Sequence, residues 1–149
     1  MRVLVTRINK GEISIRGQAV SSVEKGLALF VSMEKEDNES DLLFLADKVV
    51  NLRIFENEQG KMHYSVKDKN YQILCISNFT LCANTDKGRR PSFESSMPPA
   101  QANKLFDDFV LLLKSRGVDV SLGVFGERMD IDLVMDGPVN IILQTKRGE

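Results

Sequence analysis

The chain has 149 residues, which suffice for one domain with a hydrophobic core and are too few for two domains of ordinary size. Its 20 lysines and arginines nearly balance its 21 aspartates and glutamates, so the formal net charge is −1 and a protein-wide basic field for nucleic acid is excluded. A polyanionic partner must therefore be bound by a local basic patch.

The two cysteines, Cys75 and Cys82, bear on redox chemistry and metal binding. They lack a C-x-x-C spacing and a ligand-rich neighbourhood, so we expect neither structural zinc nor a disulfide. The opening residues 1–8 are too short and too charged for an export signal, and no apolar stretch approaches the length that spans a bilayer. We therefore expect a cytoplasmic protein.

The first half of the chain predicts one helix among several strands. Runs rich in β-branched residues favour strands, and Gly17 favours a hairpin between the second and the third. The helix is expected to follow Asn38 or Ser40, either of which would cap it, because apolar residues recur at helical spacing over 42–50. The expected strands are residues 2–8, 12–16, 18–23, 26–33, 52–55 and 63–66.

The second half begins with a strand at 71–77 that is apolar on both faces, followed by a polar, basic loop at 84–96. A second helix is expected to start at Pro98-Pro99 and to end at Gly117. Three final strands are expected at 118–122, 128–135 and 139–145, and a frayed tail at 146–149. We predict a single α/β domain over residues 1–149, a three-layer β/β/α sandwich with mostly antiparallel strands and two main helices.

Two short segments near strand ends are the best candidates for function. Ser77-Asn78-Phe79-Thr80-Leu81 closes one apolar run, and Asp136-Gly137-Pro138-Val139-Asn140 opens the last one. Neither segment contains a conventional nucleophile–base pair, and the whole chain has one histidine. An enzyme built on this chain would draw its chemistry largely from backbone groups and from its substrate.

These two segments and several others resemble the D-aminoacyl-tRNA deacylase family. Any one of them is weak as a signal, but together they stand in one order over essentially the whole chain. The matching pieces are Arg7, Val50-Asn51-Leu52-Arg53-Ile54-Phe55, Ser77 to Leu81, Lys87-Gly88-Arg89-Arg90-Pro91-Ser92-Phe93, Phe125-Gly126 with Met129, and Asp136-Gly137-Pro138-Val139. The resemblance implies a cytoplasmic homodimeric hydrolase that binds aminoacyl-tRNA and frees it from D-amino acids, and from glycine attached to alanine tRNA. Such chiral proofreading serves translation quality control, and we expect no cofactor.

The resemblance also implies where the ester would be cleaved. The backbone N–H groups of Phe79 and Thr80 would hold the oxyanion, beside Asn78. Thr80 as a nucleophile would need a nearby base, and no histidine, lysine or carboxylate adjoins it in sequence. We therefore favour a water activated with help from the ribose 2′-hydroxyl of the substrate, with the Thr80 nucleophile as the alternative.

Chirality would be sensed by a separate element in this family. The resemblance implies that Gly137 and Pro138, joined by a cis peptide bond and anchored by Arg7, enter the partner subunit's pocket. A rigid backbone carbonyl beside the substrate Cα leaves no room for an L side chain, whereas a D side chain points elsewhere. The expected pocket wall consists of Ser77, Phe125 and Met129.

Lys87, Arg89 and Arg90 form a compact basic cluster that would contact phosphates of the tRNA acceptor stem. Three positions depart from the usual family pattern, which has Gln, Asn and Thr where this chain has Asn78, Met135 and Asn140. These departures motivate two alternatives. One is a related tRNA deacylase with another substrate range, such as glycyl- or L-alanyl-tRNA, and the other is a nucleic-acid-binding protein with reduced catalysis.

Overall fold

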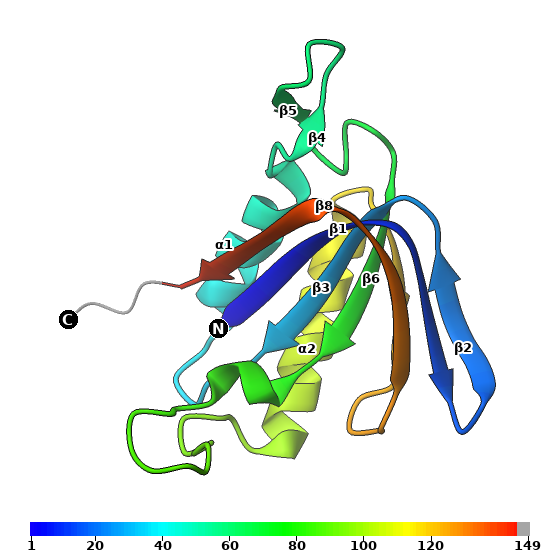
Figure 1. The fold of residues 1–149 in the computed structure, drawn as a ribbon. Coiled ribbons are helices and arrows are strands. Elements are labelled where there is room, and N and C mark those ends of the chain that lie inside the picture. The colour runs from blue at the N-terminus through cyan, green and yellow to red at the C-terminus, as the bar shows by residue number, and fades with distance from the viewer. Residues whose placement is uncertain (146–149) are drawn as a thin grey trace.

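One long amino-terminal strand, β1 (Arg2–Ile15), organises the sheet (Figure 1). Its first half pairs antiparallel with β3 (Gly26–Ser32), and its second half pairs antiparallel with β2 (Gln18–Val23). Its other edge pairs antiparallel with β8 (Asp130–Gln144) along nearly its whole length. The computed structural model describes residues 1–145, so the tail expected at 146–149 lies outside the described residues.

Two parallel strands complete the sheet beyond β3. β6 (Gln72–Ser77) pairs with β3, and β7 (Asp119–Leu122) pairs with β6. The short strands β4 (Phe55–Glu56) and β5 (Met62–Tyr64) form a separate antiparallel hairpin. Antiparallel pairs therefore outnumber parallel ones, as predicted.

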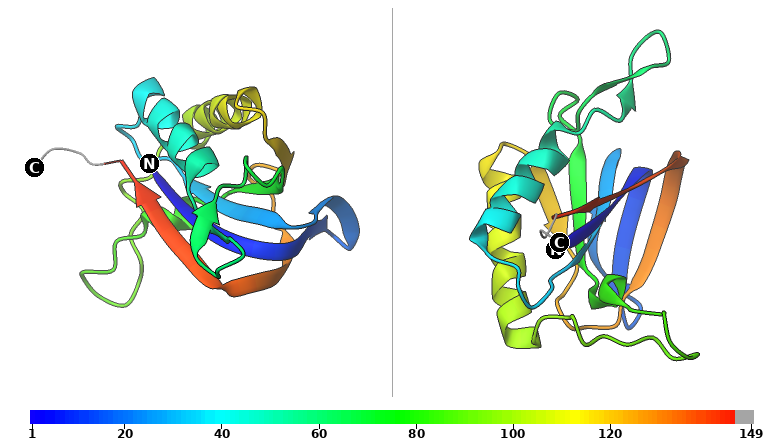
Figure 2. Two further views of the ribbon diagram at one scale, coloured as in Figure 1. Left: turned by 90° about the horizontal axis from the view of Figure 1, so that it is seen from above. Right: turned by 90° about the vertical axis from the view of Figure 1, so that its left-hand side faces the viewer.

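The two predicted helices lie together on one face of the sheet (Figure 2). α1 (Glu39–Asn51) starts with a capping box, in which the Asn38 side chain accepts a hydrogen bond from the backbone N–H of Ser40 and the Asp41 side chain accepts one from that of Asn38. Such a cap stabilises a helix by about 1 kcal/mol. α2 (Pro99–Ser115) has proline at its first position, where no intrahelical N–H is needed.

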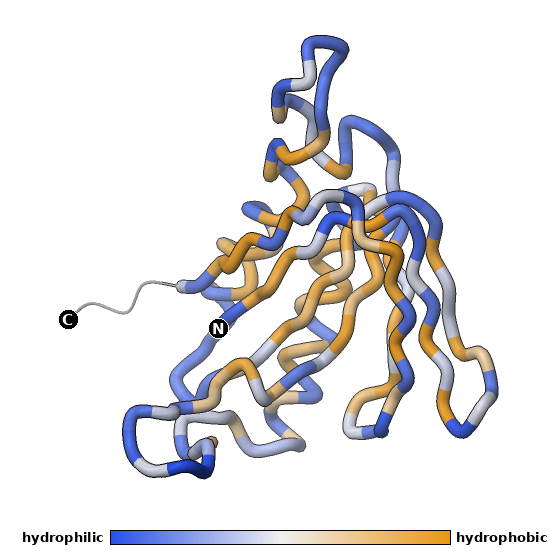
Figure 3. The backbone as a smooth tube through the Cα atoms, in the orientation of Figure 1, coloured by the Kyte–Doolittle hydropathy of each residue, from blue (hydrophilic) through white to orange (hydrophobic). Residues whose placement is uncertain are grey.

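The core has two parts, which lie on opposite faces of the sheet. One part fills the space between the helices and the strands and includes Val3 and Val5 of β1. The other includes Ile13, Val23 and Leu74. It lies where β2, the second half of β1 and the first half of β8 fold over β3 and β6. Apolar residues follow these strands, whereas the loop after β6 is largely polar (Figure 3). The β/β/α layers are present, and both β layers belong to one continuous sheet.

Two predicted interruptions are wrong, because β1 and β8 each run through a position expected to end a strand. In β1, Gly11 stays paired with Val23 and Leu133, and a Cβ there would lie 2.9 Å from the Leu74 side chain. The glycine therefore allows close packing and makes no turn. In β8, the Gly-Pro segment forms a bulge within the strand and does not separate two strands.

The structure also adds one element that the sequence analysis lacks. The 3-10 helix η1 (Phe79–Cys82) follows β6 directly and contains most of the first candidate segment. The fold is otherwise the predicted mixed α/β domain with two main helices, whereas the homodimer stays a prediction. No helix within residues 1–145 is long and apolar enough to cross a membrane.

Candidate active site

A cavity of about 600 Å³ opens beside η1, where β6 ends and α2 begins. Four of the predicted site residues line it: Ser77, Asn78, Phe79 and Phe125. Its wall continues through apolar side chains that the sequence analysis did not assign to a site, Met33, Phe93 and Met97 among them. The structure thus brings together residues from β6, η1 and the loop before β8.

The backbone of η1 begins with two open donors, those of Phe79 and Thr80, and of these two residues Phe79 lines the cavity. The amide of Leu81 is the first in the turn to bond within it, to the carbonyl of Asn78. The N–H groups of Phe79 and Thr80 precede that bond, and neither has an acceptor within the described part of the chain. Unbonded amides at the start of a helical turn are suited to hold developing negative charge.

The carbonyl groups of the same turn are, in contrast, held by side chains from distant parts of the chain. The Arg2 guanidinium donates to the Leu81 carbonyl at 3.0 Å, and its other nitrogen pairs with Glu34 at 3.4 Å. Ser32 donates to the Phe79 carbonyl at 3.4 Å, and Ser95 to that of Cys82 at 3.2 Å. These bonds fix the turn, so the open amides keep their direction. Nothing local in the sequence predicted Arg2, Ser32 or Ser95, because their partners are far away along the chain.

The side chains of Asn78 and Thr80 contact each other. The Thr80 hydroxyl donates a hydrogen bond to Oδ1 of Asn78. No histidine, lysine or carboxylate among residues 1–145 bonds to Thr80, and an amide oxygen is a very weak base. This geometry gives the Thr80 hydroxyl no means of losing its proton to the protein.

An aromatic pair forms the outer wall of the cavity. The Phe79 ring is 56% exposed and packs edge-on against Phe93, with ring centroids 5.1 Å apart and planes at 68°. Exposed ring faces of this kind are suited to stack a nucleobase. Phe93 belongs to the loop that also contains Lys87, Arg89 and Arg90, all exposed and without an ion pair inside the described range. The loop is closed by paired backbone bonds between Asn84 and Ser92.

The last residue of η1, Cys82, has a buried thiol. Cys82 is 2% exposed, and its Sγ lies against the Ser32 hydroxyl. Burial raises the pKa of the Cys82 thiol, and the Ser32 hydrogen bond opposes this only in part. Burial likewise raises the pKa of the fully buried Cys75. Both cysteines are therefore protonated and unreactive at neutral pH.

The second candidate segment forms a bulge in β8. Met135 pairs with Ile8 and Asn140 with Thr6, so the four residues 136–139 lie opposite the single residue Arg7. The Gly137–Pro138 peptide bond is cis. A Cβ added to Gly137 would lie 2.2 Å from the backbone nitrogen of Val139, so the bulge in this form requires glycine.

Arg7 holds the beginning of this bulge. Its side chain is 7% exposed, and its Nε donates to the Asp136 carbonyl at 3.1 Å and pairs with the Asp136 carboxylate at 3.2 Å. Its Nη1 donates to the Ile54 carbonyl at 2.7 Å, and Glu56 lies 3.7 Å from Nη2. Arg7 and Asp136 line a small polar cavity of about 190 Å³. The predicted contact of Arg7 with this segment is therefore present.

The bent part of β8 that contains the bulge and the 3-10 helix η1, beside which the 600 Å³ cavity opens, lie at opposite ends of the molecule (Figure 1). Gly137 and Pro138 are exposed and do not line the cavity. Met129, expected in the pocket wall, packs instead against the second core cluster, beside Gly123. One copy of the chain thus leaves the two candidate segments apart.

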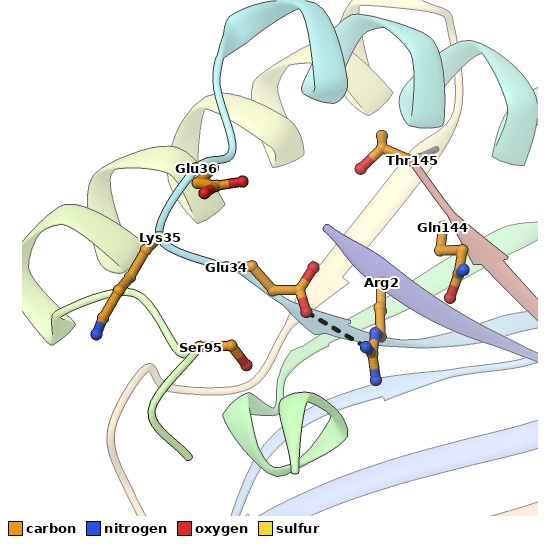
Figure 4. A pocket seen from close by; sticks show the side chains of 7 residues that line it. All are labelled: Arg2, Glu34, Lys35, Glu36, Ser95, Gln144 and Thr145. Atoms are coloured by element: carbon orange, nitrogen blue, oxygen red, sulfur yellow. Dashed lines mark ion pairs between the residues drawn. The ribbon is translucent and has the colours of Figure 1, made fainter. Parts of the chain in front are cut away.

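A further cavity, of about 450 Å³, lies at the amino-terminal end of β1 (Figure 4). Its lining mixes both signs of charge, with Arg2 and Lys35 beside Glu34 and Glu36. Arg2 and Glu34 point toward each other there and form the ion pair described above. None of the predicted site residues lines this cavity. It is connected with the candidate site through Arg2, which lines it and also donates a hydrogen bond to the Leu81 carbonyl of η1.

Comparisons with known proteins agree with the geometry. A family model described as D-Tyr-tRNA(Tyr) deacylase matches residues 4–144. A D-aminoacyl-tRNA deacylase of Thermodesulfovibrio yellowstonii is 44% identical over 146 residues, covering 98% of this chain and 100% of the relative. A D-aminoacyl-tRNA deacylase of Clostridium perfringens is 44% identical over 148 residues, covering 99% of each.

Two solved structures have the same fold. One, described as a c-Myc DNA Unwinding Element Binding Protein, has a TM-score of 0.93 at 34% identity, and the match covers 99% of this chain and 100% of that one. The other, described as a probable eukaryotic D-amino acid tRNA deacylase, has a TM-score of 0.82 and covers 95% and 97% of the two chains. At 16% identity, the second likeness bears on the fold alone.

Proposed function

Because this chain belongs to the D-Tyr-tRNA(Tyr) deacylase family, we propose that it hydrolyses the ester between a D-amino acid and the terminal adenosine of tRNA. The products are free tRNA and the free amino acid. Glycine attached to alanine tRNA is a second substrate, since it has no side chain for a chiral gate to reject. The observation that carries this proposal is the pair of open amides at the start of η1, those of Phe79 and Thr80, next to a cavity that Ser77, Asn78 and Phe79 of the same motif line.

The reaction proceeds at these amides. When water attacks the ester carbonyl, negative charge develops on its oxygen, and fixed N–H donors stabilise that charge more than they stabilise the ground state. The bond to the ribose oxygen then breaks, and that oxygen takes up a proton. The neighbouring ribose 2′-hydroxyl helps to activate the water. Asn78 keeps the Thr80 hydroxyl in place beside the reacting ester.

Discrimination between D and L substrates comes from a second copy of the chain. Gly137 and Pro138 of one protomer enter the cavity beside η1 of its partner, where their main chain occupies the space that an L side chain needs. Two facts support this arrangement: Gly137 and Pro138 are exposed, and the bend of β8 lies far from η1 of its own protomer (Figure 1), beside which the cavity opens. The functional unit in this proposal is therefore a homodimer.

The tRNA end binds across the surface next to η1. The terminal adenine stacks at Phe79 and Phe93, with Phe125 in the cavity wall behind. Lys87, Arg89 and Arg90 contact phosphates of the acceptor stem, which position the RNA without reading its sequence. The reaction needs no metal or organic cofactor, and it takes place in the cytoplasm, where tRNA is charged.

The test is a paired assay of D-Tyr-tRNA and L-Tyr-tRNA deacylation by the wild-type protein. The proposal expects rapid hydrolysis of the D ester and no measurable hydrolysis of the L ester above the spontaneous rate. Equal hydrolysis of both esters would contradict the chiral gate. A lack of turnover with every aminoacyl-tRNA would contradict the proposed activity itself.

A nucleic-acid-binding protein with reduced catalysis is the second candidate. It is favoured by the match to the structure described as a DNA unwinding element binding protein, and by the departures at Asn78, Met135 and Asn140. Tight tRNA or single-stranded DNA binding without turnover would support it. A related deacylase for glycyl- or L-alanyl-tRNA is a third, and turnover of those esters in preference to D-Tyr-tRNA would distinguish it.

A further inference from the structure

The bulge in β8 is closed at its far end by a side-chain hydrogen bond. The Thr6 hydroxyl donates to Oδ1 of Asn140 at 2.8 Å, and these two residues are also register partners across β1 and β8. Asn140 is thus the first residue after the bulge whose pairing with β1 is regular. The two residues are 134 positions apart in the sequence, so no local sequence pattern predicts this hydrogen bond.

Thr6 and Arg7 hold the bulge from opposite faces of β1. Successive side chains of a strand point to opposite faces, so the two neighbours reach β8 on different sides of the sheet. Arg7 bonds to Asp136, where the bulge begins, and Thr6 bonds to Asn140, where it ends. Between them, Gly137, Pro138 and Val139 offer no polar side chain that could hold the loop.

The Thr6 end of this arrangement is rigid. Thr6 is 3% exposed and pairs with Ala28 of β3 as well as with Asn140, so it lies in the middle of the sheet. Its hydroxyl has no other bond within the described residues. An apolar residue at position 140 would leave a buried hydroxyl without an acceptor, which drives the two strands to separate or shift locally.

We propose that Asn140 is a positioning residue for the chiral gate and that it acts through Thr6. This inference rests on the function proposed above. It adds that two contacts, Arg7 with Asp136 and Thr6 with Asn140, together determine the position of the Gly137–Pro138 segment. A gate that moves by about 1 Å loses steric rejection first, because exclusion of an L side chain depends on contact distance, whereas hydrolysis at η1 of the partner does not use Asn140.

The experiment measures kcat/KM for D-Tyr-tRNA and L-Tyr-tRNA in two matched pairs of variants. Thr6→Val removes the hydroxyl at nearly constant shape, and Thr6→Ser keeps it. Asn140→Leu removes the acceptor, and Gln144→Leu makes the same change at an exposed position of β8 outside the gate.

We expect Thr6→Val and Asn140→Leu to lower the D-to-L ratio about three- to tenfold, the range that one hydrogen bond supplies. Most of the change is a rise in kcat/KM for the L ester. The double variant should lose no more than either single variant, because both remove one bond. Thr6→Ser and Gln144→Leu should keep the wild-type ratio.

Three results would overturn the proposal. The first is that the wild-type protein discriminates between the esters and that Thr6→Val and Asn140→Leu keep its D-to-L ratio of kcat/KM. The proposed function would then remain intact. Another is an equal loss on both esters that follows the melting temperature, which indicates a merely structural role. A wild-type protein that does not separate D from L esters would remove this inference together with the gate on which it rests.

Discussion

The Thr80 hydroxyl donates a hydrogen bond to Oδ1 of Asn78, two residues before it at the start of η1. A hydroxyl that acts as a nucleophile must instead give its proton to a base, and an amide oxygen does not accept it at neutral pH. We therefore expect Thr80 to contribute its backbone N–H to the site, while Asn78 holds its hydroxyl in place.

The Thr80→Val variant tests this role. It keeps the backbone N–H and the shape of the side chain, so we expect kcat for D-Tyr-tRNA to fall by no more than about tenfold, in line with the loss of one hydrogen bond. Single-turnover deacylation gives the value directly. A loss of 1000-fold or more in a folded protein would instead identify the hydroxyl as the nucleophile.

The open amide of Phe79 is testable by proline substitution. Phe79→Pro deletes this N–H at the first position of η1, where proline fits, and Asn78 before it has φ −147° and ψ 84°, compatible with a following proline. Phe79→Ala removes the same ring but keeps the N–H. We expect kcat of Phe79→Pro to be about 100- to 1000-fold below that of Phe79→Ala, the usual effect of one oxyanion donor. Equal rates would place the oxyanion elsewhere.

The basic loop should determine affinity and leave chemistry unchanged. Replacing Lys87, Arg89 and Arg90 with glutamine is expected to raise KM and to lower the slope of log KM against log salt by roughly 2 to 3, about one per lost phosphate contact. kcat should change less than about twofold. The control is Lys61→Gln/Lys67→Gln, which removes exposed lysines between and after β4 and β5, a hairpin at the opposite end of the molecule from η1 (Figure 1). The same shift in the control would mean that net charge alone matters.

The buried thiols give stability a pH dependence. Because the pKa of Cys75 is raised in the folded state, the thiol stays protonated there while the unfolded chain loses its proton above about pH 8.5. The unfolded state then binds fewer protons, so the free energy of unfolding falls as pH rises, by up to about 1.4 kcal/mol per pH unit for each such thiol. Urea titrations between pH 8.5 and 10 should show a shallower decline for Cys75→Ala. An unchanged decline would contradict the burial effect.

Local patterns predicted both helices and most strands, because the residues that form them carry their own signals. The Asn38 cap and the spacing of apolar residues fix α1, and proline at the first position fixes the start of α2. The same reasoning failed at Gly11 and at the Gly137–Pro138 bulge, because both lie in gaps between expected strands that prove to be inside long strands. There, pairing with β1 over many residues outweighs the local preference.

The candidate site was predicted in part, for a related reason. One cavity is lined by four of the predicted residues, Ser77, Asn78, Phe79 and Phe125. They meet because the end of β6, η1 and the loop before β8 lie next to one another. The groups that hold η1, Arg2 above all, were not predicted, because they meet the turn only in the folded chain. Met129, just before β8, is partly buried and packs against the second core cluster, a contact that forms only in the folded chain.

The central claim, that one protomer's bulge guards the partner's ester site, is tested most directly with mixed dimers. One protomer carries Gly137→Ala, whose added Cβ would lie 2.2 Å from the Val139 nitrogen and must displace the bulge. The other carries Phe79→Pro, which disables its own η1. The only competent η1 then faces an intact bulge from the other protomer. We predict that this mixed dimer rejects L-Tyr-tRNA as the wild type does, whereas the Gly137→Ala homodimer hydrolyses it. A mixed dimer that hydrolyses the L ester as readily as that homodimer would contradict the claim.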